Sequence, residues 1–153
     1  MKASGPVRNS YTQEVDISHY IRRLGGVEYR VANNPGDYAA ARKLIKEKNV
    51  EAPKLTFPTI LAWKDGELLG LLGTYVKQSV PYLGPLVLKY PSRPFTGIRL
   101  LDSYDNVMRA TGVEAYAIFV YKEEGDMQKW IELMPGAKLR ATTDEGWHYI
   151  RRL

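Results

Sequence analysis

The stretch LVLKYPSRPFTGIRLL, residues 86–101, joins the end of a predicted strand to the start of a predicted helix. Its apolar opening gives way to a loop with two prolines, and apolar residues recur at helical spacing from Ile98 onward. Backbone N–H groups at a helix N-terminus lack intrahelical partners and, together with the helix dipole, favour anions. Gly97 permits close approach of a ligand, and Arg93 and Arg99 add positive charge. The pattern therefore predicts a turn that can bind phosphate.

Two apolar strands flank this turn, at residues 82–90 and 114–121. Gly84-Pro85 lies inside the first strand, and because proline has no N–H to donate, it predicts a bulge or a locally splayed edge. The second strand is apolar through its middle, which is typical of a buried strand that runs parallel to the preceding one after a crossover helix. We therefore expect a βαβ unit with a gap beside its first strand.

Periodicity and turn residues define the rest of the chain. Residues 1–26 are polar, with a short amphipathic helix candidate at 15–24, and we interpret them as an arm packed on a domain of residues 27–153. Residues 68–73 are apolar on both faces, which predicts an interior strand. The other expected elements are a strand at 27–32, a helix capped by Asn34, a hairpin of strands 59–63 and 68–76, a helix from Ile98, a helix at 126–134 and a hairpin of strands 138–143 and 147–153.

Composition places the chain among globular proteins and excludes several kinds of chemistry. Its 153 residues suit one domain, and 44% hydrophobic with 25% charged residues argue against disorder. The absence of cysteine excludes disulfides, thiolate metal sites and cysteine nucleophiles. His19 and His148 have no ligand partner at helical spacing, so we expect no metal site. No apolar run approaches the roughly 20 residues that cross a bilayer, and we expect a soluble, cytoplasmic protein without a membrane partner.

The chain is basic, with 22 Lys and Arg against 17 Asp and Glu and a net charge of +5. This charge suits an anionic partner such as a nucleotide cofactor or a nucleic acid, and it equally suits a role in solubility alone. Arg151-Arg152, beside Trp147 and Tyr149, comes nearest to a nucleic-acid face, although a solvated strand edge explains it as well. The sequence leaves the oligomeric state open.

The order of these elements, together with residues 86–101, resembles the GNAT superfamily of acetyl-CoA-dependent N-acetyltransferases. The resemblance covers residues 27–153, and residues 86–101 look like the family's fourth strand and its R/Q-x-x-G-x-G/A pyrophosphate loop. It implies a single-domain α/β (α+β) fold: a mixed central sheet with a bulged fourth strand, a βαβ crossover and flanking helices. It also implies acetyl-CoA as cosubstrate and direct attack by a primary amine of an unidentified acceptor, with nucleic acid or a nucleotide among the options.

The resemblance also implies roles for individual residues. The amine must be deprotonated to attack the thioester, and the site must supply a donor for the oxyanion and an acid for the departing thiolate. Tyr121, at the end of the buried strand, is the expected acid, and Glu124 in the next loop is the expected catalytic carboxylate; a structural role stays open for both. Glu123, Tyr75, Tyr82 and a water molecule also stay open as the base. The residues expected to bind acetyl-CoA are Leu86, Val87, Leu88, Arg93, Phe95, Thr96, Gly97, Ile98 and Arg99. A backbone N–H near the first three is expected to donate to the oxyanion.

A second function stays open on the same residues. The predicted loop keeps one glycine, Gly97, where the family pattern has more, and Pro94 cannot donate an N–H. The alternative is therefore a GNAT-like chain that has lost acetyl transfer and acts as a binding module for nucleic acid or a protein partner. An enzyme should bind acetyl-CoA through Arg93 and Gly97. A binding module should not bind acetyl-CoA and should bind an anionic partner with an affinity that depends on salt.

Overall fold

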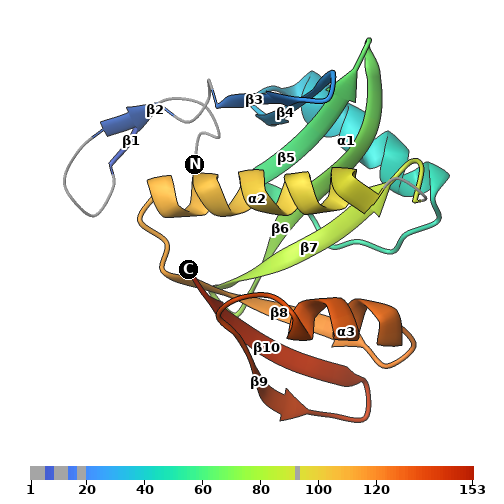
Figure 1. Cartoon of the computed structure of the whole chain (residues 1–153), viewed down its shortest axis with the longest axis vertical. Helices are drawn as coiled ribbons and strands as arrows, with labels where there is room; N and C mark the ends of the chain where they lie inside the picture. The colour runs from blue at the N-terminus through green and yellow to red at the C-terminus, as the bar shows by residue number, and fades with distance from the viewer. Residues whose placement is uncertain (1–5, 9–13, 17–19, 92–93) are drawn as a thin grey trace.

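The computed structural model describes residues 6–8, 14–16, 20–91 and 94–153. These residues form ten strands and three helices, arranged as Figure 1 shows. The strands are β1 (Pro6–Arg8), β2 (Glu14–Asp16), β3 (Ile21–Leu24), β4 (Val27–Val31), β5 (Thr56–Lys64), β6 (Glu67–Lys77), β7 (Val80–Leu88), β8 (Ala115–Tyr121), β9 (Ala137–Thr142) and β10 (Gly146–Arg152). The helices are α1 (Pro35–Glu47), α2 (Pro94–Ala110) and α3 (Gly125–Glu132).

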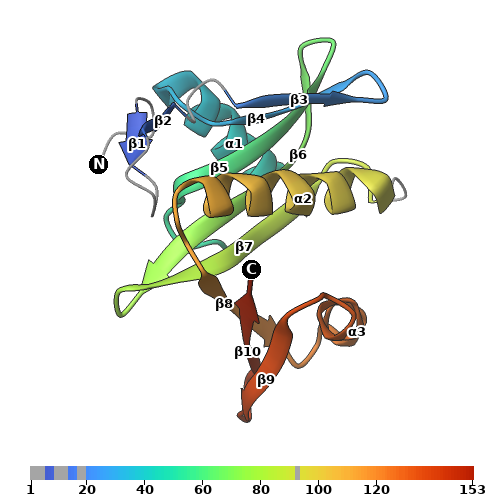
Figure 2. The ribbon, with the colours of Figure 1, turned by 60° about the vertical axis from the view of Figure 1, so that its left-hand side comes forward.

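Strands β3 to β10 form one eight-stranded sheet in the order β3-β4-β5-β6-β7-β8-β10-β9, while β1 and β2 pair separately. Neighbouring strands of the large sheet are antiparallel except β7 and β8, which are parallel and are connected through α2. Helix α2 lies across one face of the sheet and α1 lies on the opposite face (Figure 1, Figure 2). The mixed α/β architecture and its βαβ unit therefore confirm the predicted fold class.

Local sequence signals explain two of these elements. Asn34 caps α1, because its side chain accepts a hydrogen bond from the Asp37 N–H at 2.9 Å, and Pro35 is the first residue of the helix. Strands β5 and β6 turn at Asp65-Gly66, where both residues have positive φ, as a tight two-residue hairpin requires. Both features confirm their predictions.

Strand β6 is buried from residue 68 to residue 74, because α1 and α2 pack on its two faces. Its glycines are sites of close approach. A Cβ atom on Gly70 would lie 3.0 Å from the Val87 carbonyl oxygen, and one on Gly73 would lie 2.6 Å from a methyl carbon of Leu55. The prediction of an interior strand is confirmed, and the two glycines make its packing possible.

Strand β7 carries a bulge at Gly84-Pro85. Its register with β6 shifts there: Leu72 pairs with Leu86 but Thr74 pairs with Leu83, so three residue steps of β7 oppose two of β6. Gly84 has a φ of 127°, a conformation that side chains other than glycine's rarely allow. The predicted bulge is confirmed.

The bulge divides the sheet into two halves. Strands β7 and β8 share the single register pair Tyr82 with Ala117, and they diverge beyond it (Figure 1). One half contains β3 to β7 with α1 and α2, and the other contains β8 to β10 with α3. The predicted splayed edge is therefore confirmed as well.

Two predictions about helices are wrong. Residues 21–24, predicted as the end of an amphipathic helix, form β3 and pair with β4. The tight turn between them is made by Gly25 and Gly26, both at positive φ. Helix α2 begins at Pro94 rather than at Ile98, because the fixed φ of proline suits the first helical position. Residues 15 and 16 of the same candidate helix belong to strand β2, and residues 17–19 lie outside the described residues. The boundary at residue 26 stays a prediction.

A buried polar network ties the two halves of the sheet together. Arg151 of β10 donates hydrogen bonds to Asp105 of α2, to the hydroxyl oxygen of Tyr116 in β8 at 2.7 Å, and to the Pro135 carbonyl oxygen at 3.1 Å. The Tyr116 hydroxyl donates to Asp105 at 2.8 Å. Arg151 is only 6% exposed, so placing it on a solvated edge or a nucleic-acid face is wrong, although Arg152 beside it is exposed.

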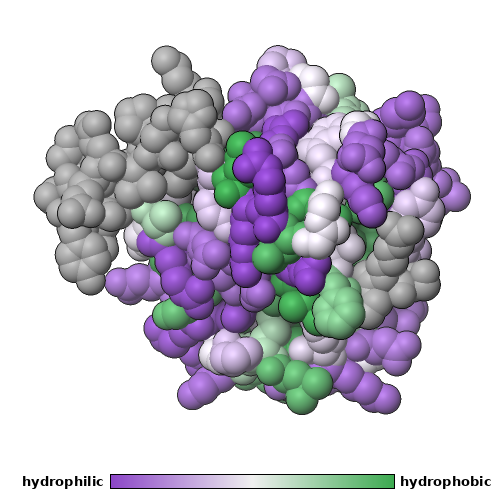
Figure 3. Space-filling view, turned by 45° about the horizontal axis from the view of Figure 1, so that its top comes forward, coloured by the Kyte–Doolittle hydropathy of each residue, from purple (hydrophilic) through white to green (hydrophobic). Residues whose placement is uncertain are grey.

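Hydrophilic residues cover much of the face shown in Figure 3, with hydrophobic residues in patches between them. In the part of the chain that the structure describes, the helices are too short or too polar to cross a membrane.

Candidate functional site

A cavity of about 720 Å³ lies in the opening between β7 and β8. Its walls come from β6, β7, β8 and β10, from α3, and from the segments that precede β5 and β10. Gly84-Pro85 and Leu86 form part of the β7 wall, and residues 118–121 form the β8 wall. The bulge therefore opens the cavity, because β8 cannot pair with β7 beyond Tyr82.

Aromatic side chains line this cavity from both halves of the sheet. The rings of Tyr75 and Tyr82 stack with their centroids 5.1 Å apart and an angle of 17° between their planes. Phe119 meets Tyr121 edge to face at 4.8 Å and lies 4.6 Å from the His148 ring. Burial, followed by the nearby Tyr82 and Tyr121 phenols, raises the pKa of Tyr75 to about 12. Tyr75 therefore stays protonated at neutral pH, which suits a hydrogen-bond donor and argues against Tyr75 as the base.

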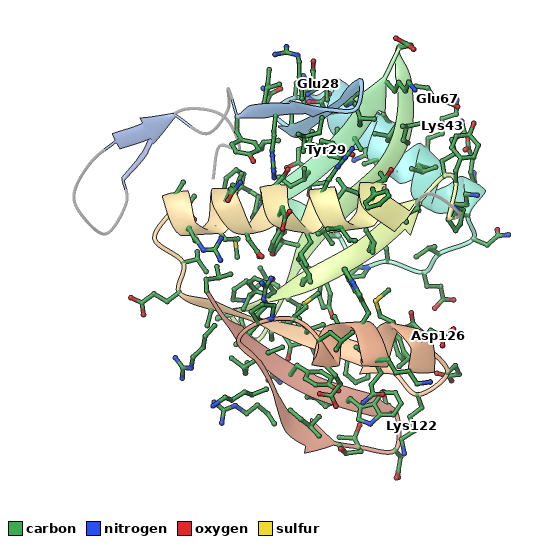
Figure 4. All side chains as sticks on the ribbon, in the orientation of Figure 1. Glu28, Tyr29, Lys43, Glu67, Lys122 and Asp126 are labelled. Carbon is green, nitrogen blue, oxygen red and sulfur yellow. The ribbon has the colours of Figure 1, made fainter. Side chains whose placement is uncertain are left out.

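Tyr121 and Glu124 lie together at the rim of the cavity. Tyr121 is 54% exposed at the end of β8, and its carbonyl oxygen accepts a hydrogen bond from the Glu124 N–H at 2.9 Å. Glu124 is exposed and immediately precedes α3. Figure 4 labels Lys122, on the connection between β8 and α3, and Asp126, in the first turn of α3. This short connection therefore holds a phenol and a carboxylate at the mouth of the same cavity.

The backbone of β7 supplies donors on the side of the opening. The Lys89 N–H donates to the Leu69 carbonyl oxygen of β6 at 2.8 Å. Because hydrogen-bonding directions alternate along a strand, the amide of Val87 also faces β6, whereas the amides of Leu86 and Leu88 face the opening. A carbonyl oxygen placed beside Leu86 would therefore meet an N–H donor from β7.

Helix α2 begins close to the end of β7 (Figure 1). Phe95, Thr96 and Gly97, predicted as loop residues, belong to the first turn of the helix. The N–H groups of this turn have no carbonyl partner inside the helix, and they lie at the positive end of its dipole. Pro94 contributes no N–H to this set.

The side chains around this helix start have different environments. Phe95 is 65% exposed, and the Arg99 guanidinium lies 5.7 Å from the centre of its ring. A Cβ atom on Gly97 would lie 3.7 Å from a methyl carbon of Leu88, so the glycine faces β7. Arg99 also approaches the β3–β4 turn, with Nη1 3.0 Å from the position of a Cβ atom on Gly25. The helix start is therefore open to solvent at Phe95 and packed against the sheet at Gly97.

The structure brings together some of the predicted site residues. Leu86, Tyr121 and Glu124 line the cavity. Val87, Leu88, Phe95, Thr96, Gly97, Ile98 and Arg99 do not contribute to its lining, and Arg93 lies outside the described residues. Within the described residues, no group of three or more His, Asp or Glu side chains is placed to hold a metal ion.

Helix α3 supplies cavity residues that the sequence analysis missed. Met127, Trp130 and Ile131 line the cavity. They recur at the helical spacing of three and four residues, so the apolar face of the predicted helix is the signal that could have identified them.

No family model and no curated protein matches this sequence. Solved structures do match. PaiA N-acetyltransferase from Thermoplasma acidophilum, in complex with coenzyme A, has a TM-score of 0.52 and 16% identity over 71% of this chain and 65% of that chain. An acetyltransferase of the GNAT family from Staphylococcus aureus has a TM-score of 0.64 and 11% identity over 83% of this chain and 99% of that chain. The chain has the GNAT fold.

A third matching structure is of a much longer chain. N-acetylglutamate synthase from Neisseria gonorrhoeae, in complex with coenzyme A and N-acetyl-glutamate, has a TM-score of 0.60 and 13% identity over 86% of this chain. The present chain spans 36% of that synthase and 65% of PaiA. The aromatic residue that α3 contributes to the cavity of this chain is Trp130.

Proposed function

We propose that this chain transfers an acetyl group from acetyl-CoA to a primary amine. The neutral amine nitrogen attacks the thioester carbonyl carbon, a C–N bond forms and the C–S bond breaks. The nitrogen gives up one proton, and the departing thiolate accepts one. The reaction therefore requires a donor for the carbonyl oxygen, an acid for the sulfur and a route for the amine proton.

The observation that carries the proposal is the cavity between β7 and β8, with the start of α2 beyond the end of β7. An extended acetyl-pantetheine arm suits a slot between two diverging strands, where the amides of Leu86 and Leu88 are free to pair with it. The pyrophosphate suits the positive end of α2. PaiA and N-acetylglutamate synthase, which share the fold, form complexes with coenzyme A.

Three groups at this cavity take the chemical roles. The Leu86 amide donates to the oxyanion of the reacting carbonyl. The Tyr121 hydroxyl protonates the departing thiolate. Glu124 accepts the proton of the amine, directly or through water, at the exposed rim where an acceptor would enter.

Release of the CoA thiol is the direct test. Because the chain contains no cysteine, every thiol detected by a thiol reagent comes from CoA. The purified protein is given acetyl-CoA with a panel of primary amines, and mass spectrometry identifies the acetylated product. Thermal unfolding is followed in parallel, because a ligand at a hundred times its Kd stabilises the native state by about 2.7 kcal/mol. Thiol release without product would show hydrolysis instead of transfer.

A binding module is the alternative, and Pro94 at the start of α2 favours it because one pyrophosphate donor is lost. In that case acetyl-CoA at millimolar concentration leaves the unfolding temperature unchanged. The protein would instead bind an anionic partner with an affinity that falls steeply as salt rises.

A further inference from the structure

Strand β6 lies between two irregular neighbours. On one side, the β7 bulge falls between the partners of Leu72 and Thr74. On the other side, Leu72 pairs with Ile60 and Thr74 pairs with Thr56, so four residue steps of β5 oppose two of β6. Strand β5 therefore bulges opposite the same segment of β6, and Thr74 is in register with both neighbours at one end of that segment.

Hydrogen bonds of the Thr74 side chain join this point to helix α2. The Thr74 hydroxyl donates to the Pro58 carbonyl oxygen, in the β5 bulge, at 2.8 Å, and it lies 2.8 Å from the Tyr104 hydroxyl oxygen. Because a threonine hydroxyl has one proton, Tyr104 is the donor in the second bond. Tyr104 and Thr74 are 0% and 1% exposed. Burial raises the pKa of Tyr104, so its hydroxyl stays protonated at neutral pH.

Consecutive residues of α2 bond to the two halves of the sheet. Tyr104 bonds to β6, in the half that carries both bulges, whereas Asp105 bonds to Tyr116 and Arg151 in the other half. The rings of Tyr104 and Tyr116 also meet edge to face, with centroids 5.3 Å apart. The helix is therefore held at one point along its length, about 15 Å from its start at Pro94 at 1.5 Å per residue.

We propose that Tyr104 is a positioning residue for acetyl transfer, because its hydroxyl, acting through Thr74, fixes the bulged strand β7 relative to the start of α2. This inference rests on the proposed function, in which the start of α2 holds the pyrophosphate and the Leu86 amide donates to the reacting carbonyl. The pantetheine arm joins these two groups in acetyl-CoA, so the distance between their binding sites must match its length. Tyr104 does not line the cavity and acts only by keeping that distance constant.

The variant Tyr104→Phe removes the hydroxyl and keeps the ring. We expect kcat per folded molecule to fall about tenfold or more, because a small displacement of a reacting group slows the chemical step. The Kd of acetyl-CoA should rise by about threefold or less, because the N–H groups at the start of α2 are unchanged. Thiol release is measured with the primary amine that gives the wild type its highest rate, and calorimetry gives the Kd. A purely structural hydroxyl would affect the unfolding temperature and leave kcat of the folded molecules unchanged.

Tyr29 provides the matched control. It is also 0% exposed and belongs to the same hydrophobic core as Tyr104, but its hydroxyl has no hydrogen-bond partner within the described residues. Tyr29→Phe therefore removes a buried tyrosine hydroxyl without breaking a bond. We expect its kcat and its Kd for acetyl-CoA to stay within about twofold of the wild type.

Substitutions of Thr74 test the other partner of the bond. Thr74→Ser keeps the hydroxyl and should keep kcat within about threefold, whereas Thr74→Val keeps the shape alone and should lower kcat at least as much as Tyr104→Phe. Adding Tyr104→Phe to Thr74→Val should cause no further loss, because the bond is already absent. The comparison of serine with valine also carries the test if Tyr104→Phe is too unstable to assay.

Amide hydrogen exchange adds a measurement without acetyl-CoA. If the Tyr104 hydroxyl holds the bulges, the amides of β7 around Gly84-Pro85 should exchange about fivefold faster or more in Tyr104→Phe, because local opening there becomes easier. The same amides should exchange at the wild-type rate in Tyr29→Phe.

The outcomes separate this inference from the proposed function. If the wild type acetylates an amine and Tyr104→Phe matches it in kcat and in exchange, the positioning role is overturned and acetyl transfer stands. The same holds if Tyr29→Phe is slowed as much as Tyr104→Phe, or if Thr74→Ser is as slow as Thr74→Val. If the wild type neither binds acetyl-CoA nor releases its thiol, the proposed function fails, and the positioning role fails with it.

Discussion

Tyr82 of β7 lies opposite Ala117 of β8, and no other register pair joins these two strands in the described part of the chain. Beyond this pair the bulge at Gly84-Pro85 turns β7 away, so the amides in its C-terminal part have no partner on β8. A strand edge with free amides binds extended ligands through backbone hydrogen bonds. The Tyr82–Ala117 pair is therefore the point from which the cavity opens.

Removing the hydroxyl of Tyr121 should slow turnover and spare acetyl-CoA binding. In Tyr121→Phe, the edge-to-face contact with Phe119 at 4.8 Å is retained, so the rim keeps its shape. If the hydroxyl protonates the thiolate, we expect kcat to fall about a hundredfold, the lower range for loss of a general acid. Tyr90→Phe, which removes an exposed hydroxyl bonded to Glu67, is the control. Full activity in Tyr121→Phe would exclude this residue as the acid.

A negative charge at the start of α2 should weaken acetyl-CoA binding without destabilising the fold. Gly97 is unsuited to the test, because it is buried and a side chain there would begin in contact with the methyl groups of Leu86 and Leu88, an apolar setting for a carboxylate. Phe95 is 65% exposed, and an acidic side chain in a first helical turn is favourable to the helix. We expect Phe95→Glu to raise the Kd of acetyl-CoA about fivefold relative to Phe95→Gln, with an equal or higher unfolding temperature.

Titration calorimetry and thermal unfolding of the two Phe95 variants measure both effects. If Phe95→Glu and Phe95→Gln bind acetyl-CoA equally well, the pyrophosphate does not lie at the start of α2. The prediction that Phe95, Thr96, Gly97 and Ile98 bind acetyl-CoA would then be wrong for all four residues.

Local turn chemistry made the centre of the fold predictable. Gly84-Pro85 indicates the bulge because a proline cannot complete a ladder, and Asp65-Gly66 indicates the β5–β6 hairpin. The same kind of signal exists at Gly25-Gly26, a dipeptide typical of tight hairpins, but the apolar spacing of residues 15–24 favoured a helix. There the pairing of β3 with β4 outweighed the helical pattern.

Contacts between distant residues could not be predicted from the sequence. Asp105 and Arg151 are 46 positions apart, and their polar side chains give no sign that each neutralises the other inside the core. The cavity depends in the same way on residues that precede β5 and on residues of α3, which meet only after the sheet splits. The sequence predicts Tyr121 and Glu124 one at a time, whereas their shared cavity is visible only in the structure.

Stability in acid should depend on Asp37. Its carboxylate accepts hydrogen bonds from Arg30 at 2.7 and 2.8 Å and from the Asn33 N–H at 3.1 Å. Burial opposes ionisation, but these partners outweigh it and hold the pKa of Asp37 below its usual value. A carboxyl with a lowered folded pKa adds stability above its unfolded pKa of about 3.9, and this stability is lost as the pH falls through the folded pKa.

Urea unfolding across the acid range measures this contribution. We expect the free energy of unfolding of the wild type to fall more steeply below about pH 5 than that of Asp37→Asn, so that the two curves converge in acid. Asp144→Asn, at an exposed position, should follow the wild type. Parallel curves for the wild type and Asp37→Asn would contradict a lowered pKa.

Removing Arg151 should lower the free energy of unfolding, because its hydrogen bonds join the two halves of the sheet. Asp105 is 3% exposed, and Arg151→Met would leave its carboxylate buried without the cation that donates hydrogen bonds to it, which costs about 3–5 kcal/mol in comparable pairs. The neighbouring Arg152→Met removes an exposed guanidinium and should change the free energy of unfolding by about 0.5 kcal/mol or less. Adding Asp105→Leu to Arg151→Met should recover most of the loss, because no buried charge then remains. Equal effects of Arg151→Met and Arg152→Met in urea unfolding would mean that packing alone joins the halves.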